Sequence, residues 1–189
     1  NWGGVNELAF MLGFFLYAIV HWFLFKPLFI HVMGHEFTHA VFSMMFGGKV
    51  KSISISGKSG AVTTDKTNFI VNLAPYFFPI YTIVFLALYF LIAQQYKIYA
   101  LFLVGFTLSF HFIATAHSLK TEQTDFKTTG KIFSYVFVYL MNIFMLMCII
   151  AVISPDIGVY NDVIRGIGLD TWNALVKAYG YIMHRGNPA

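Results

Sequence analysis

Charged residues are scarce in this chain of 189 residues. Asp, Glu, Lys and Arg together make up 11% of it, against about 25% in ordinary soluble domains. Hydrophobic residues make up 58%, and a soluble domain of this length buries only about 70% of the surface that its unfolded chain exposes. The single cysteine, Cys148, excludes a fold stapled by disulfides. Lipid is therefore the expected solvent for most of the chain.

The sequence also lacks internal repeats, low-complexity tracts and long linkers, so we expect a single integral membrane domain over residues 1–189. A transmembrane helix needs about 20 predominantly apolar residues. Five segments are long enough, which predicts an all-α membrane protein with a core at about 28–153 and an amphipathic tail at 155–189. Within the tail Asp170 can cap a short helix that either lies at the membrane interface or packs against the membrane domain. The five predicted spans are Leu8–Phe25, Pro27–Phe46, Phe69–Ala93, Ile98–Ala116 and Ile132–Ile153.

The net charge of +4 is spread over short connections, so we expect no nucleic-acid partner. The rule that cytoplasmic loops are rich in Lys and Arg places the connections at 47–67 and 117–131, together with the N-terminus, in the cytoplasm. We expect an integral protein of a bacterial cytoplasmic membrane whose active site opens toward the cytoplasm. The lysines that carry this prediction are Lys49, Lys51, Lys58, Lys66, Lys120, Lys127 and Lys131.

The connection between the second and third spans has a different pattern. Residues 49–56 alternate between Ser on one side and Lys or Ile on the other, which is typical of a strand. Residues 57–60 contain two glycines and favour a turn, after which 61–64 can return as a second strand. The sequence predicts a small β-hairpin at the cytoplasmic face.

Two prolines and an asparagine interrupt the third predicted span. They are Asn72, Pro75 and Pro79. Proline removes a backbone donor and clashes with the preceding turn of a helix. The interruption is consistent with a simple kink and with a functional break in the helix.

The second span contains an HExxH motif, formed by His35, Glu36 and His39. On a helix the two histidines stand one turn apart on one face, so that both can bind one Zn²⁺ ion, and Glu36 can deprotonate a water molecule. Ionisable residues inside a spanning helix are costly and mark function. The motif therefore predicts a zinc site.

A catalytic zinc site needs a third protein ligand. Asp125 is the first choice, because it lies in the one polar loop on the same side as the hairpin; its alternative role is to cap the fifth helix. His117 is the second choice, and Asp65 and His111 are weaker ones. His31, one turn before His35, is either a neighbour of the metal ligands or a buried histidine bonded to a carbonyl group.

These features are similar to those of the site-2 protease class of intramembrane metalloproteases, the M50 and M50B-like group. The resemblance covers about residues 28–130 and is carried by His35–His39, by residues 46–50 before the hairpin, and by Asn72 with Pro75. It implies zinc-dependent peptide hydrolysis within the membrane, with Glu36 as the base. The family's Asp-Gly signature for the third ligand is missing, so the choice of Asp125 rests on its place in the sequence.

The expected function is that of a zinc intramembrane endopeptidase in which His35, His39 and Asp125 bind the metal. Asn72 either orients the substrate and polarises its carbonyl group, or bonds a neighbouring helix. Expected partners are a membrane-embedded protein or peptide substrate, the lipid bilayer and other membrane subunits. A non-proteolytic scaffold subunit is the main alternative, since no PDZ-like segment is seen to select substrates. A transporter with broken helices is a third reading.

Overall fold

The computed structural model describes residues 4–24, 26–57, 59–121 and 124–153, together with residues 165–166, 169, 173 and 176–177. The chain separates into two compact units, residues 1–149 and 150–189. The predicted tail helix around Asp170 and Trp172 lies almost wholly outside the described residues. All of the elements discussed below that position the candidate site belong to the first unit.

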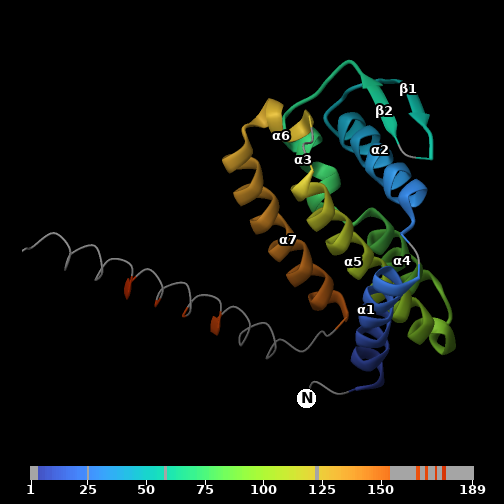
Figure 1. Cartoon of the computed structure of the whole chain (residues 1–189). Coiled ribbons are helices and arrows are strands. Elements are labelled where there is room, and N and C mark those ends of the chain that lie inside the picture. Colours follow the sequence, from blue (N-terminus) through green and yellow to red (C-terminus); the bar gives the residue numbers. More distant parts are fainter. Residues whose placement is uncertain are drawn as a thin grey trace, which may run out of the picture. The chain divides into compact units, whose positions relative to one another are not determined.

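The described chain is mainly helical and carries one small antiparallel sheet (Figure 1), which confirms the predicted class. In chain order the elements are α1 (Val5–Phe23), α2 (Leu28–Met45), β1 (Val50–Ile55), β2 (Gly60–Thr64), α3 (Phe69–Phe77), α4 (Ile80–Leu91), a short 3₁₀ turn (Gln94–Tyr96), α5 (Lys97–Lys120), α6 (Thr124–Thr129) and α7 (Lys131–Ile153).

Three described helices are long and apolar enough to cross a membrane: α1, α5 with its preceding 3₁₀ turn, and α7. The bent pair of α3 and α4 makes a fourth if it is counted as one span. Helix α2 does not qualify, because its 18 residues include three histidines and Glu36. The protein is thus a membrane protein, but the expected count of five spans is not confirmed.

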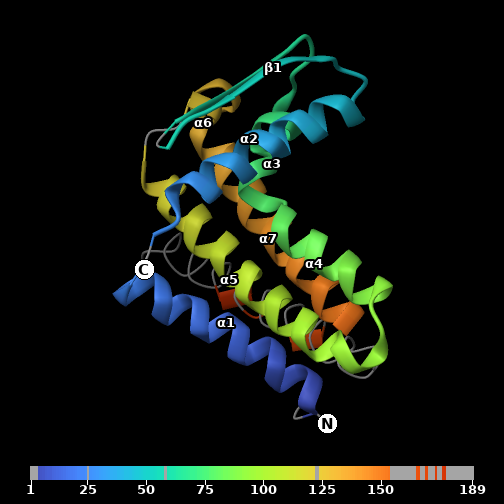
Figure 2. The same ribbon diagram turned by 90° about the vertical axis from the view of Figure 1, so that its right-hand side faces the viewer.

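The hairpin forms where the sequence predicts it. Strand β1 pairs antiparallel with β2, and Ile53 faces Val62 in the register. An Asp65 carboxylate oxygen accepts a hydrogen bond from the Lys49 amide at 2.6 Å, which closes the open end of the hairpin. Figures 1 and 2 show the hairpin at one end of the helical core and the start of α1 at the other. The prediction that the N-terminus and the hairpin share one side of the membrane depends on counting α2 as a span, and α2 is not among the described helices apolar enough to cross.

Helices α1 and α5 pack closely where two glycines meet. A Cβ atom added to Gly13 would clash with the Phe102 carbonyl group, and one added to Gly105 would clash with the carbonyl group of Phe10. Small residues let helix backbones approach in membranes, where van der Waals packing and not the hydrophobic effect holds helices together. Helices α1 and α5 are therefore held against each other by direct backbone contact.

The third predicted span is broken at Phe78 and Pro79. Helix α3 ends at Phe77, α4 begins at Ile80, and the two helices are bent by 68°. Phe78 is extended, with φ −96° and ψ 106°, as the residue before a proline prefers. Pro75 lies inside α3 without ending it. The interruption is therefore a sharp break and not a gentle kink.

A compact hydrophobic core lies among α2, α3, α6 and α7. It determines where the short helix α6 sits, because Phe126 inserts into it and is only 2% exposed. Apolar burial of this kind is the main force that orders a short helix. The buried members are Phe42, Val71, Leu73, Ala74, Tyr76, Phe77, Phe126 and Val138.

Candidate metal centre

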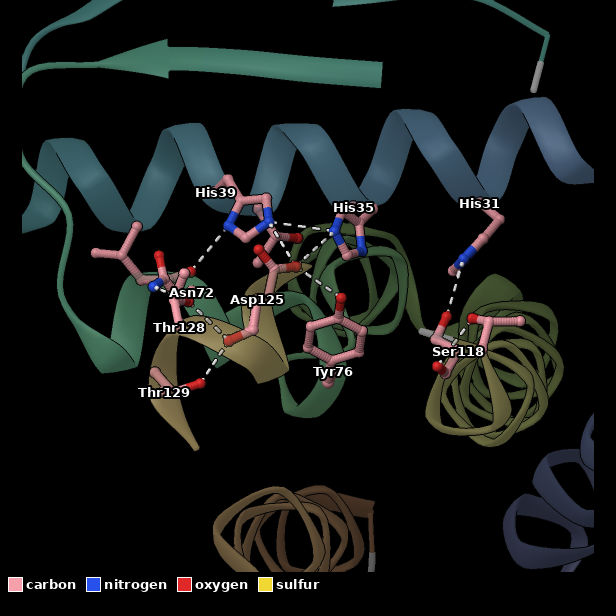
Figure 3. A network of polar contacts seen from close by, with 12 residues as sticks. His31, His35, His39, Asn72, Tyr76, Ser118, Asp125, Thr128 and Thr129 are labelled. Atoms are coloured by element: carbon pink, nitrogen blue, oxygen red, sulfur yellow. Dashed lines mark hydrogen bonds and ion pairs between the residues drawn. The ribbon is translucent and has the colours of Figure 1, made fainter. Parts of the chain in front are cut away.

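Helix α2 presents His35 and His39 on one face, as the motif predicts (Figure 3). Their Nε2 atoms lie 3.1 Å apart, and their ring centroids are separated by 4.8 Å. Both side chains are largely buried, at 16% and 15% exposure. The helical spacing of four residues therefore brings two imidazole nitrogens toward one point.

The ring of His39 is oriented by α3. Its Nδ1 atom lies 2.9 Å from the Val71 carbonyl oxygen, which can only accept a hydrogen bond. Nδ1 therefore carries the proton and donates it, which leaves a lone pair on Nε2. Histidines that bind metals commonly have this arrangement, because the second bond fixes both the tautomer and the direction of the ring.

Asp125 lies opposite the two histidines, in the first turn of α6. Its Oδ2 atom is 3.6 Å from Nε2 of His35 and 3.7 Å from Nε2 of His39. Its neighbour Phe126 is buried in the core, which holds α6 against α2 and α3. The side chain of Asp125 thus points at the histidines and does not cap the helix α7, which begins at Lys131.

The three groups have the spacing that a zinc ion requires. Ligand atoms at about 2.0–2.1 Å from a tetrahedral zinc lie about 3.3 Å from each other. The observed separations are 3.1, 3.6 and 3.7 Å. Among the described residues, His35, His39 and Asp125 form a group of His, Cys, Asp or Glu whose ligand atoms are all close enough to share a metal ion.

The electrostatics of the group also favour a cation. Burial alone would raise the pKa of the Asp125 carboxyl, but the neighbouring rings of His35 and His39 and the hydrogen bond from Tyr76 outweigh it and hold the pKa below its ordinary value. Asp125 is therefore ionised at neutral pH and supplies a full negative charge. Two imidazoles and one carboxylate are a known donor set for catalytic zinc, and the residues fit this metal.

Glu36 lines a cleft next to the two histidines. The side chain is 8% exposed, and the cleft has a volume of about 540 Å³. Strand β2 lies close to Glu36, because a Cβ atom at Gly60 would stand 2.8 Å from Oε1 of Glu36. Only glycine fits there without a shift. The cleft is lined by His35, Glu36, His39, Gly60, Ala61, Val62, Thr63, Thr64, Thr67, Val71, Asn72, Thr124 and Asp125.

Asn72 also lines this cleft, from α3. Its amide oxygen accepts a hydrogen bond from Thr67 at 2.6 Å, and its amide nitrogen donates to Thr128 of α6 at 3.3 Å. The structure therefore shows the bond between neighbouring helices that the sequence left open as one of two roles.

The other residues weighed as ligands lie elsewhere. His117 is exposed and lines a separate hollow with His21 and Lys26. Asp65 closes the hairpin, and His111 bonds Asn142 of α7 at 3.2 Å.

His31 faces α5 and does not join the metal group. Its Nε2 atom is 3.4 Å from the hydroxyl oxygen of Ser118. Its ring lies 6.1 Å from that of His35, against 4.8 Å between His35 and His39. Of the two roles left open for it, the structure favours the second in part: His31 is half-buried and bonds a neighbouring helix through a hydroxyl group and not a carbonyl group.

Sequence reasoning missed Tyr76 and Gly60. Tyr76 is the only hydroxyl-bearing residue between Pro75 and Pro79 in the interrupted span, and its hydroxyl group donates to Oδ2 of Asp125 at 2.7 Å. Its place in a broken hydrophobic helix could have singled it out. In the sequence, Gly60 indicates only a turn. Its closeness to Glu36 depends on the packing of β2 on α2.

Comparison with known proteins adds the family. No curated protein and no solved structure matches the chain. The family model described as Peptidase M50B-like matches residues 8–121, more than half of the chain, which include the HExxH motif, the hairpin and the break after α3. The match ends before Asp125, so that residue's place in the site rests on the geometry given above. The chain belongs to the Peptidase M50B-like family.

Proposed function

We propose that this chain is a zinc-dependent endopeptidase that cleaves a membrane-embedded protein or peptide substrate. The observation that carries the proposal is the convergence of His35, His39 and Asp125 at zinc-ligand spacing, next to a cleft lined by Glu36. Membership of a family of membrane peptidases supports it. A structural metal site would need no carboxylate such as Glu36 beside it.

His35, His39 and Asp125 would hold the zinc ion. Zinc supplies Lewis-acid chemistry when bound, since it acidifies water and polarises a carbonyl oxygen. Glu36 takes the proton of the attacking water and later gives it to the leaving amine, as a general base and then a general acid. Asn72, at the wall of the same cleft, orients the peptide group that is cleaved.

Strand β2 gives the cleft a means to hold an unwound substrate. A helical substrate must unwind before cleavage, because its amides are bonded within the helix. The described sheet has two strands, so the second edge of β2 carries no strand. An extended peptide can add to such an edge through backbone hydrogen bonds. Since β2 lines the cleft, a peptide paired there would run past Glu36.

The side of the membrane to which the cleft opens follows from the end of the molecule that carries the site. Helix α2 and the hairpin lie at the same end of the helical core (Figure 2). The lysine-rich connections belong to this end, so the rule on positive charge places it at the cytoplasm. We propose that the cleft opens toward the cytoplasmic side of the membrane.

The test is proteolysis by the purified, zinc-loaded chain in lipid vesicles. A panel of transmembrane-helix peptides is added to the vesicles, and mass spectrometry identifies the new termini. We expect cleavage by the wild type and a loss of about 10²–10⁴-fold for Glu36→Gln, with zinc content unchanged. If the wild type binds zinc but never differs from Glu36→Gln, the chain is a metal-binding scaffold and the proposal is wrong.

A further inference from the structure

Tyr76 makes contact with the candidate metal centre from α3. Its hydroxyl group donates to Oδ2 of Asp125 at 2.7 Å, and Oδ2 is also the oxygen that faces Nε2 of both histidines. Figure 3 shows the hydroxyl group directed at Asp125 from below α2. Tyr76 therefore contacts the carboxylate oxygen that is available to a metal ion.

The aromatic ring of Tyr76 is held on two sides. Its centroid lies 5.1 Å from that of His35 and 4.5 Å from that of Phe126. The residue is 1% exposed and belongs to the hydrophobic core that orders α6. The hydroxyl group therefore has little freedom to swing away from Asp125.

The backbone of Tyr76 is held by two further helices. In a continuous helix its carbonyl oxygen would accept from residue 80, but the Ile80 amide bonds Phe78 because the helix breaks at Pro79. The freed oxygen accepts from Asn142 of α7 at 2.8 Å and from Thr115 of α5 at 3.2 Å. Such a freed carbonyl at membrane depth requires partners.

Asn142 is itself fixed in one orientation. Its amide nitrogen donates to the carbonyl oxygens of Tyr76 and Val138, both at 2.8 Å. Its amide oxygen therefore faces His111, whose Nε2 atom donates at 3.2 Å. The chain of contacts runs from α5 through Asn142 and Tyr76 to Asp125.

We propose that Tyr76 is a positioning residue that holds the Asp125 carboxylate in the direction needed to bind the metal. The inference rests on the proposed zinc site. When both histidines bind a metal through Nε2, neither can donate from that atom to Asp125, and Tyr76 is the hydrogen-bond donor to Oδ2 among the described residues. Helix α6 has only six residues, so this bond and the burial of Phe126 determine where the carboxylate points.

The test measures zinc affinity of the full chain in detergent, by competition with a fluorescent chelator. Tyr76→Phe keeps the buried ring and removes only the hydroxyl group. Partners of metal ligands typically contribute 10–100-fold to affinity, and we expect a loss of about this size. The matched control is Tyr81→Phe, which removes the bond to the Ile30 carbonyl oxygen at 2.7 Å and should leave the affinity unchanged.

A second step separates positioning of Asp125 from a general loss of structure. In the Asp125→Ala background, which a weaker chelator can follow, Tyr76→Phe should cause no further loss of zinc affinity. The cobalt-loaded wild type and Tyr76→Phe should also differ in their visible spectra, because the carboxylate contact changes.

Each failure has its own meaning. If the wild type does not bind zinc in competition with the chelator, the proposed function fails. If the wild type binds zinc and Tyr76→Phe binds it within about twofold, only the positioning role is overturned. An equal loss with Tyr76→Phe in the wild-type and Asp125→Ala backgrounds would also overturn it, since the effect would then not pass through Asp125.

Discussion

Helix α2 contains two pairs of histidines with the same spacing, and they differ in almost everything else. His31 and His35 are four residues apart, as are His35 and His39. The first pair has ring centroids 6.1 Å apart, and the second pair has them 4.8 Å apart. Spacing along a helix therefore makes a shared metal possible without deciding which pair is used.

The partners of each ring account for the difference. His39 donates to the Val71 carbonyl oxygen and faces Asp125, so its free nitrogen points to a carboxylate. His31 instead meets the hydroxyl group of Ser118 on α5, which carries no charge. A metal centre on a helix thus needs a group that fixes each tautomer and a charged third ligand from another element.

The largest expected effect is the difference in zinc content between variants of His39 and His31. His39→Ala should reduce the zinc content of the purified protein from about one ion per chain to near zero, because it removes one of three protein ligands. His31→Ala removes a histidine from the same helix and should leave the zinc content unchanged. Elemental analysis of both variants measures this. Equal zinc loss in the two variants would mean that the pairs do not differ.

An effect of about the same size is expected at the third ligand. Asp125→Ala should lower zinc occupancy about as much as His39→Ala, whereas Asp125→Asn should keep the fold and lose most of the activity, because an amide carries no negative charge. His117→Ala and Asp65→Ala are the controls, since both side chains lie outside the group. Zinc titration followed by calorimetry distinguishes them. Loss of zinc in His117→Ala with retention in Asp125→Ala would show a site of three histidines.

The smallest effect concerns the hairpin, which lies beside the His35–His39 pair. Gly60→Ala should lower peptidase activity by about tenfold while zinc content stays the same, because its methyl group displaces Glu36 from its place in the cleft, and small misplacements of a catalytic group are costly. Gly57→Ala is the matched control, since nothing lies within 4 Å of a Cβ atom at that position. Activity assays on both variants test this. Identical activities would show that β2 does not position Glu36.

Local patterns predicted part of this structure well. The HExxH spacing required a helix, and the alternation of residues 49–56 indicated the hairpin that forms at β1 and β2. Charge and place in the sequence were enough to select Asp125. Each of these inferences depends on residues close in sequence or on a single charged side chain in a suitable loop.

Long-range packing accounts for what the sequence did not show. The apolar run of α2 predicts a span, but its polar residues lower its hydropathy. The predicted sides of the membrane depend on that count of spans. Tyr76 contacts Asp125 across 49 residues of sequence, and Gly60 contacts Glu36 only because β2 packs on α2. No local period encodes either contact.

The central claim is that His35, His39 and Asp125 bind one zinc ion together. X-ray absorption at the zinc edge of the purified, zinc-loaded chain tests it most directly. We predict a first shell of nitrogen and oxygen at about 2.0–2.1 Å with multiple scattering from two imidazoles, and loss of this zinc signal in His39→Ala. A spectrum without imidazole scattering, or one unchanged in His39→Ala, would contradict the account.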